Sequence, residues 1–227
     1  MAYFVEFTRA VTGVTDRTTC GFVCLGSGLS MPVTIGAKLE NDFTNPLGLL
    51  QDCHRRIERF LGVIVEIIRE TKGQHLDDQQ RTALTTALRY FREAAPKHTE
   101  DEEVSLFPRL RESGGEAATD ALNAVERLEA DHVKAKSWHE QIEALGQRWL
   151  ADGALGEQDS LRFQELSDQL VTLYQEHIDI EDNQLFPKAR TVLTAEHLKA
   201  IGAEMADRRG IPHTLVLPVR RDENPNP

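Results

Sequence analysis

Apolar residues recur at alternating steps of three and four along most of the chain, which is the spacing of one face of an amphipathic helix. The first run begins after Asn45-Pro46, a helix-start signal, and ends at Lys72-Gly73. Later runs are delimited by a capping Asp77 or Asp78, by Ser113-Gly114-Gly115 and by Asp152-Gly153. The pattern predicts an all-α fold, an up-down-up-down four-helix bundle with short connections.

Each predicted helix carries a histidine inside its apolar seam. The seams are Leu50, His54, Ile57, Leu61, Ile64 and Ile68; Leu84, Leu88, Phe91, Ala95, His98 and Glu102; Val125, Leu128, His132, Ala135, His139 and Ile142; and Phe163, Leu166, Leu170, Leu173, His177 and Ile180. Burying an unpartnered polar group costs about 1–3 kcal/mol. One such histidine is explained by a hydrogen bond to a core neighbour, but one in every helix indicates a shared role. We also expect Pro96 to kink the second helix just before His98.

An eleven-residue motif occurs twice. HTEDEEVSLFP begins at His98, and HIDIEDNQLFP begins at His177. In both copies a glutamate follows the histidine at +4, one helical turn on and on the same face. His54 precedes the first copy and His132 the second by nearly the same interval, so the chain reads as two helix pairs of matching layout.

This layout predicts a buried site to which six side chains converge. They are His54, His98, Glu102, His132, His177 and Glu181. A helical His-x-x-x-Glu on its own is ordinarily a solvated ion pair. Two buried carboxylates, however, are costly to desolvate and repel each other unless a cation binds them. The doubled motif with two further seam histidines therefore indicates a metal site.

The order H, HxxxE, H, HxxxE, with LFP after each HxxxE, resembles the hemerythrin-like HHE cation-binding domain over about residues 44 to 190. The resemblance implies a four-helix bundle around a carboxylate-bridged non-haem di-iron centre, in a family linked to oxygen, nitric oxide, peroxide or iron chemistry. It implies the four histidines as terminal ligands and Glu102 and Glu181 as bridges. It also implies that Leu106-Phe107-Pro108 and Leu185-Phe186-Pro187 seal the centre from solvent.

One departure from the family pattern bears on reactivity. Oxygen-carrying hemerythrins have HxxxH in the third helix, whereas position +4 from His132 is Lys136 here. Two six-coordinate ions offer about twelve positions, of which four His and two bridging Glu fill about eight. An oxo or hydroxo bridge takes two more and leaves exchangeable sites. His139 and Tyr174 are near-site candidates; Tyr174 is interpreted first as a core residue with a hydrogen-bonded hydroxyl.

The donor set favours iron over the alternatives. Imidazole and carboxylate without thiolate suit iron or manganese, whereas structural zinc more often recruits cysteine. We therefore expect two iron ions, with zinc or manganese as the lesser alternatives. Ligating imidazoles normally donate their other N–H to an outer partner. Asp52, Glu129 and Asp131 are candidates for that role, although we interpret them as exposed charges.

The remaining composition limits partners and location. A formal net charge of -11 with 26 Lys and Arg argues against nucleic-acid or anionic-membrane surfaces. Three cysteines, among them Cys20 and Cys24, form no disulfide framework, and a reducing cytoplasm fits best. We divide the chain into an irregular extension over 1–43, the bundle over 44–192, and a short helix with a polar tail over 193–227.

Three functions are compatible with these residues. The first is a di-iron protein that binds or reacts with O2, NO or hydrogen peroxide, as a sensor or a catalase-like enzyme. The second is iron sensing or storage, and the third is an interaction module that metal or core hydrogen bonds stabilise. Open coordination positions favour the first. The residues do not separate turnover from sensing, and they identify no protein partner.

Overall fold

The computed structural model describes residues 41–113 and 116–211, and all regular structure in these residues is helical. Nearly all of the predicted extension over 1–43, with Cys20 and Cys24, and the polar tail from residue 212 lie outside the described residues. The elements, with η for a π-helical turn, are α2 (Pro46–Thr71), α3 (Asp78–Glu93), α4 (Ala95–Glu100), η1 (Asp101–Leu106), α5 (Phe107–Ser113), α6 (Glu116–Asp152), α7 (Glu157–Ile180), η2 (Glu181–Leu185), α8 (Phe186–Val192) and α9 (Ala195–Arg208).

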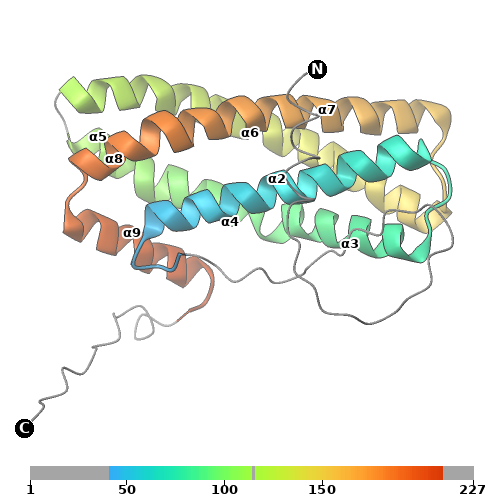
Figure 1. Ribbon diagram of the computed structural model, residues 1–227, viewed down its shortest axis with the longest axis horizontal. Coiled ribbons are helices and arrows are strands. Elements are labelled where there is room, and N and C mark those ends of the chain that lie inside the picture. The colour runs from blue at the N-terminus through green and yellow to red at the C-terminus, as the bar shows by residue number, and fades with distance from the viewer. Residues whose placement is uncertain (1–40, 114–115, 212–227) are drawn as a thin grey trace, which may run out of the picture. The chain divides into compact units, whose positions relative to one another are not determined.

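Four rods make up the bundle: α2, the segment from α3 to α5, α6, and the segment from α7 to α8. Successive rods run in opposite directions, and α2 packs against both α3 and α7, while α6 packs against the same two helices (Figure 1). The predicted all-helical bundle is confirmed. The second rod is interrupted at Ala94, two residues before Pro96, as expected for a residue that lacks an amide proton.

Local signals set the ends of these helices. The Asn45 side chain accepts a hydrogen bond from the amide of Gly48 and caps α2. Asp77 and Gln80 form a reciprocal capping box at the start of α3. Lys72 ends α2 in the left-handed conformation, with φ of 52°. The predicted boundaries therefore follow from ordinary capping chemistry.

The fourth helix departs slightly from its predicted seam. Leu173 and Ile180 are half-buried, whereas Tyr174 and Ile178 are buried. At 100° per residue, Tyr174 lies about 40° around the axis from Leu170 and Leu173 about 60°. Position 174 is thus nearer the centre of the buried face. His139 of the third seam is also only half-buried.

The core consists of two apolar clusters on either side of a polar layer. The first cluster includes Ile57, Ile64, Leu84, Leu88, Trp149, Phe163 and Leu170. The second includes Leu47, Leu50, Phe107, Leu128, Phe186, Ile201 and Met205. Along their rods, His54, His98 and His132 lie in sequence between residues of the two clusters. Within the described residues, no helix has both the length and the apolar composition to cross a bilayer.

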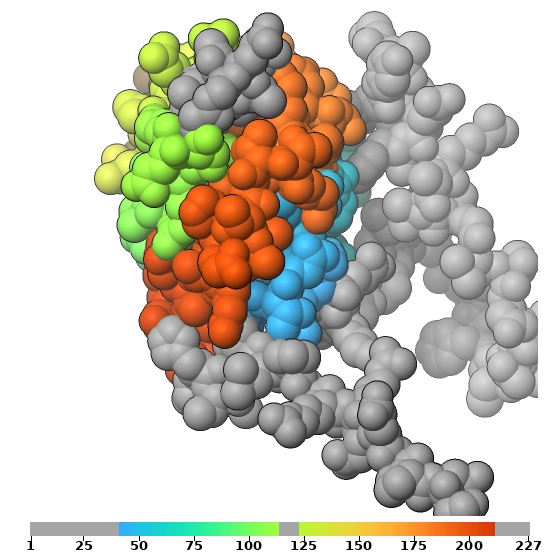
Figure 2. Space-filling view, turned by 90° about the vertical axis from the view of Figure 1, so that its left-hand side faces the viewer, coloured from blue at the N-terminus to red at the C-terminus, as the bar shows by residue number. Residues whose placement is uncertain are grey.

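Helix α9 closes one end of the bundle. It contributes Ile201 and Met205 to the second cluster and packs against η1 and the start of α2. Figure 2 looks onto this end, where α9 in red lies beside α8 and the blue start of α2. At Gly202 a Cβ atom would lie 1.9 Å from the carbonyl oxygen of Phe43, so the close approach requires glycine.

Two glycine substitutions test this packing. We expect Gly202→Ala to destabilise the fold by about 1–3 kcal/mol, because the added methyl group meets backbone that must shift. Gly62→Ala is the matched control, since a Cβ there meets nothing within 4 Å and the helix gains about 0.5–1 kcal/mol. Thermal unfolding should separate the two variants in opposite directions from the native protein. An unchanged melting temperature for Gly202→Ala would contradict the close packing of α9.

Candidate metal centre

The two repeated motifs have the same local structure. In each, an α-helix carrying the histidine passes into a π-helical turn at or next to the glutamate: α4 into η1 and α7 into η2. The turns close with hydrogen bonds from the amide of Phe107 to the carbonyl of Glu102 and from Phe186 to Glu181. Such single π turns occur frequently at functional sites.

The proline that ends each motif gives a physical reason for the wide turn. In α-helical register, the ring of Pro108 would press on the carbonyl four residues earlier, and the proline has no amide to donate. Pro187 stands in the same relation to η2. A wider turn relieves that contact. The shared LFP ending therefore has a structural role beside the sealing role that the family resemblance implies.

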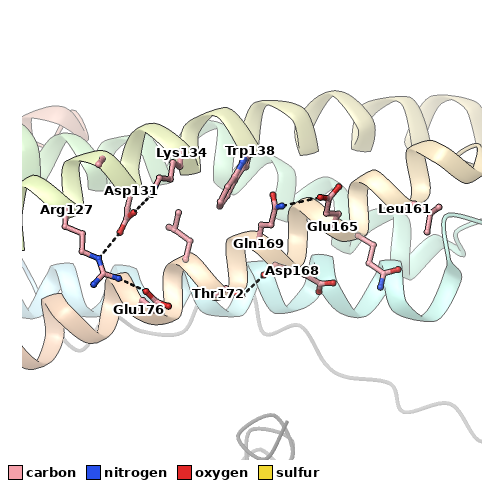
Figure 3. A pocket seen from close by; sticks show the side chains of 13 residues that line it. Arg127, Asp131, Lys134, Trp138, Leu161, Glu165, Asp168, Gln169, Thr172 and Glu176 are labelled. Carbon is pink, nitrogen blue, oxygen red and sulfur yellow. Dashed lines mark hydrogen bonds and ion pairs between the residues drawn. The ribbon is translucent and has the colours of Figure 1, made fainter.

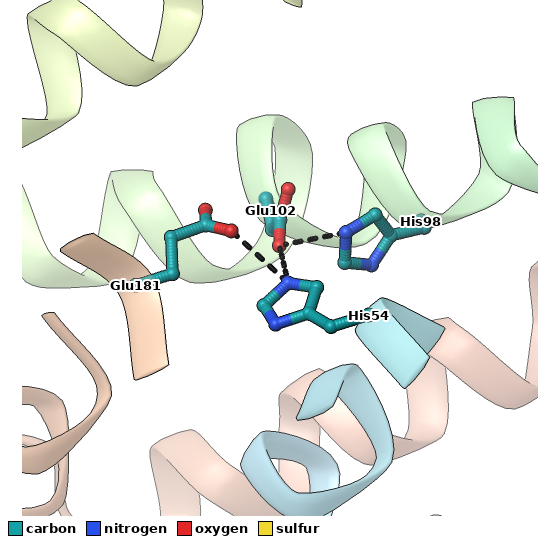
Figure 4. Close-up of side chains that lie close together, drawn as sticks. All are labelled: His54, His98, Glu102 and Glu181. Carbon is teal, nitrogen blue, oxygen red and sulfur yellow. Dashed lines mark ion pairs between the residues drawn. The ribbon is translucent and has the colours of Figure 1, made fainter. Parts of the chain in front are cut away.

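All six predicted side chains meet at one level of the bundle. His54 Nε2 lies 3.0 Å from Glu181 Oε2 and 3.8 Å from Glu102 Oε1. Within the motifs, His98 Nε2 is 3.3 Å from Glu102 Oε1, and His177 Nε2 is 3.2 Å from Glu181 Oε2. His132 Nε2 is 3.3 Å from Glu102 Oε2. Figure 4 shows His54, His98, Glu102 and Glu181 turned toward one another.

These donor atoms fit a bound cation better than they fit each other. Within the described residues, both oxygens of Glu102, both of Glu181, and Nε2 of His54 and His132 are buried without a hydrogen-bond partner. Unsatisfied buried polar atoms are rare and demand an explanation. The atoms form two overlapping groups, His54, His98, Glu102 and Glu181, and Glu102, His132, His177 and Glu181, each within 4.8 Å. Both groups can hold a metal ion.

Electrostatics at the centre show how strongly it attracts positive charge. Burial raises the pKa of Glu102, but His98, His132 and His54 outweigh it and hold that pKa well below its ordinary value. Burial lowers the pKa of His132, yet the nearby carboxylates raise it to about 9. Burial alone dominates at His98 and lowers its pKa to about 4. Protons on imidazoles and a metal cation compete for the same atoms.

The outer nitrogens of two histidines are held across the two helix pairs. His54 Nδ1 lies 2.8 Å from Asp182 of η2, and His132 Nδ1 lies 2.8 Å from Glu103 of η1. Arg55 in turn pairs with Asp182. Sequence reasoning missed both acids. The signal was present, because each repeat has a second acid directly after its glutamate.

The three acids proposed from sequence as outer partners behave differently. Asp131 is buried, so its interpretation as an exposed charge is wrong; its Oδ2 lies 3.9 Å from His177 Nδ1. Asp52 accepts hydrogen bonds from Asn41, and Glu129 pairs with Arg111. Neither contacts a seam histidine through these bonds. Burial of Asp131 follows from its place beside His132 at the level where α6 meets α7.

Aromatic rings cover the centre on the side of the second apolar cluster. Phe186 stacks on His54 with ring centroids 5.5 Å apart and an interplanar angle of 10°. Phe107 stacks on His132 at 6.3 Å and 8°. Both phenylalanines are fully buried. The LFP segments thus separate this face of the site from solvent and fix the plane of one imidazole in each helix pair.

The two near-site candidates bind each other. His139 Nε2 lies 3.0 Å from the Tyr174 hydroxyl, and the His139 ring stacks on Phe91. The Tyr174 ring lies 6.3 Å from that of His177, edge to face. Burial lowers the pKa of His139 to about 3, so the imidazole is neutral at pH 7. His139 belongs to neither metal-binding group.

Ionic contacts and hydrogen bonds with α9 hold the first π turn, η1, in place. Asp101, which precedes Glu102, is fully buried, and its two oxygens lie 2.6 Å from guanidinium nitrogens of Arg208 and Arg209. Ser105 of the same turn donates to Glu204. The position of Glu102 therefore depends on α9, a helix for which sequence analysis gave no role at the site.

Comparison with known proteins agrees with the motif. Residues 45–189 match the family described as hemerythrin HHE cation binding domain. The chain belongs to this family. The matched segment of this hemerythrin HHE domain contains all six residues whose side chains converge at the centre. A Haemophilus influenzae protein described as "Uncharacterized protein" is 27% identical over 175 residues, which cover 74% of this chain and 92% of the relative.

Outer partners should control the metal affinity of this HHE domain. We expect Asp182→Ala and Glu103→Ala each to weaken metal binding by about 10–100-fold, because the ligating imidazole loses the group that orients it. Asp179→Ala, on the exposed face of α7, is the control and should leave affinity unchanged. Competition with a chromophoric chelator for Fe2+ under anaerobic conditions measures the difference. Native affinity in both site variants would show that the two acids do not support the ligands.

Proposed function

We propose that the six side chains hold two iron ions, with Glu102 and Glu181 bridging them, and that this centre binds or reacts with O2, NO or hydrogen peroxide. The single observation that carries the proposal is the pair of overlapping donor groups that share both carboxylates. A carboxylate with two free oxygens at the junction of two such groups has one oxygen for each ion. Family membership supports a cation at this place.

The chemistry of the donors supports iron. Each group offers two imidazoles and two carboxylates, the hard and borderline set that suits iron and manganese. Cys53, the cysteine within the described residues, is buried and near Arg56 rather than in either donor group. A closed tetrahedral zinc site would more often include thiolate.

Incomplete coordination supports small-molecule chemistry. Four imidazole nitrogens and four carboxylate oxygens fill about eight of about twelve positions on two six-coordinate ions. Iron, when bound, supplies Lewis acidity and redox chemistry at the remaining positions. The protein orients the imidazoles through Asp182 and Glu103 and excludes water on one side with Phe107 and Phe186.

Metal content is the direct test. Protein purified from iron-supplied cells should contain about two iron atoms per chain, and chelation should lower its melting temperature, because a ligand of the folded state adds RT ln(1 + [L]/Kd) to stability. Metal analysis and calorimetry of the same samples provide both quantities. Metal-free protein of equal stability, with no iron taken up on reconstitution, would refute the proposal.

Reaction with peroxide distinguishes turnover from binding. We expect the iron-loaded protein to convert two molecules of hydrogen peroxide into two of water and one of O2, because the centre offers exchangeable positions next to charged carboxylates. Glu181→Ala should abolish oxygen release, measured with an oxygen electrode. Glu176→Ala, at an exposed residue of the preceding helix α7, is the control and should retain it. Equal rates in both variants would assign the reaction to adventitious iron; absence of the reaction in the native protein would favour sensing.

A further inference from the structure

A cavity of about 580 Å³ lies between the α3–α4 segment and α6. Its lining extends from the exposed Lys136 and Glu140 to the buried His132. Of the six donor residues, His132 is the one among its lining side chains. Buried Phe91, Ala95, Ala135 and Tyr174 and half-buried His139 form the wall between surface and centre. The cavity therefore connects solvent with one of the two donor groups.

The repeat explains why this side has room. Counted from the seam histidines, Ala135 corresponds to Ile57, and Ala95 corresponds to Tyr174. Both alanines line the cavity between the first and second helix pairs. Ile57, which holds the position corresponding to Ala135, is large and buried and does not line the cavity, whereas Tyr174 lines the same cavity as Ala95. Two-fold symmetry of the donors is thus broken by the size of their neighbours.

Lys136 contributes to the same asymmetry. A side chain at +4 from His132 lies one turn on, on the same side of α6. Lys136 is exposed and lines the cavity rather than entering either donor group. No imidazole occupies this place within the described chain, so the donor group of His132 and His177 borders on the cavity.

A second groove, in contrast to the cavity, is not lined by any of the six donor residues. It lies between α6 and α7, with a volume of about 760 Å³, and is lined among others by Arg127, Lys134, Trp138 and Glu176 (Figure 3). Its nearest approach to the centre is Asp131, and none of the six donor residues lines it. Charged side chains that pair with one another, such as Arg127 with Glu176, cross this groove.

The charge of the residues that line the cavity favours uncharged ligands. Its lining includes Arg92 and Lys136 against Glu100, Glu103, Glu140 and Glu143, an excess of negative charge. Its inner wall has the neutral His139 and Tyr174, hydrogen-bonded to each other. An anion would therefore meet repulsion at the mouth and two neutral side chains on the inner wall before it reaches the centre, whereas a neutral molecule meets no such repulsion.

We infer that this cavity is the route by which a small uncharged molecule reaches the centre, and that it reaches the ion position of His132 and His177 rather than that of His54 and His98. The inference rests on the proposed function, because it presumes that the donor groups hold metal. It adds the point of entry, the class of ligand and the reactive half of the centre.

Occupation of the cavity by xenon tests the route without any reaction. Crystals of the purified protein pressurised with xenon should show a xenon atom beside Ala135 and His132. In Ala135→Ile, which carries the residue found at the corresponding position 57, that atom should be lost. Ala130→Ile, on an exposed part of α6 outside the cavity, should keep it. Xenon absent from the native cavity, or unaffected by Ala135→Ile, would overturn the route.

The rate of nitric oxide binding tests whether ligands reach the centre through the cavity. In the reduced, iron-loaded protein, Ala135→Ile should slow NO association by about tenfold or more in stopped-flow absorbance, and Ala130→Ile should not. Ala95→Val is a smaller obstruction that serves if Ala135→Ile fails to fold, and it should slow NO in the same direction. Native association rates in a folded, iron-loaded variant whose xenon site is lost would overturn the inference. Failure to load iron with the xenon site intact would refute the proposed function instead.

Azide tests the charge argument in the same apparatus. Its association should accelerate as salt is raised from about 0.01 M to 0.15 M, since salt screens the acidic mouth, while NO association should not change. An azide rate that falls with salt would show that the route attracts anions and would overturn the assignment to neutral ligands.

Discussion

Two carboxylates, Glu102 and Glu181, lie fully buried at the centre of the bundle, and their mutual repulsion is the constraint on which the rest of the structure depends. Removing each carboxylate from water costs several kcal/mol unless positive charge or hydrogen bonds compensate. Imidazoles surround both carboxylates. Within the described residues, no arginine or lysine side chain forms an ion pair with Glu102 or Glu181. Compensation therefore comes from protons on imidazoles or from bound cations, and cations would also satisfy the four unpartnered carboxylate oxygens and the unpartnered Nε2 atoms of His54 and His132.

This requirement determines how the bundle is layered. An apolar cluster can be extended by any well-packed residue, but the polar layer tolerates only the geometry in which all four helices present their histidines at one height. The π turns and the Asp101 contacts with α9 act on that height, because they fix where Glu102 enters the layer. Helix α9 is thus coupled to the site through ionic contacts as well as through the apolar cluster.

Sequence periodicity was enough to predict the four rods and the level at which His54 and Glu102 meet, because burial of one helix face is recorded along each helix. It did not predict Glu103 and Asp182 as outer partners. In a regular α-helix a residue five positions after a histidine lies about 140° around the axis. The π turns alter that angle, and the partners lie on other rods. Cross-helix contacts of this kind leave no period in the sequence, and neither does the docking of α9.

The duplicated motif gives the donors a near two-fold symmetry that their surroundings do not share. His54 is held by Asp182, which Arg55 anchors and which is 12% exposed, whereas the partner of His132, Glu103, is 38% exposed and lines a cavity. A symmetric donor set can bind two ions with similar strength while the surrounding protein gives small ligands access to one of them. The choice between the two halves then depends on side-chain volume, with Ala135 at the cavity and the larger Ile57 at the corresponding position of α2. Such a difference is expressed in rates of access more than in ligand chemistry, so substitutions that never touch a donor atom can change what the centre does.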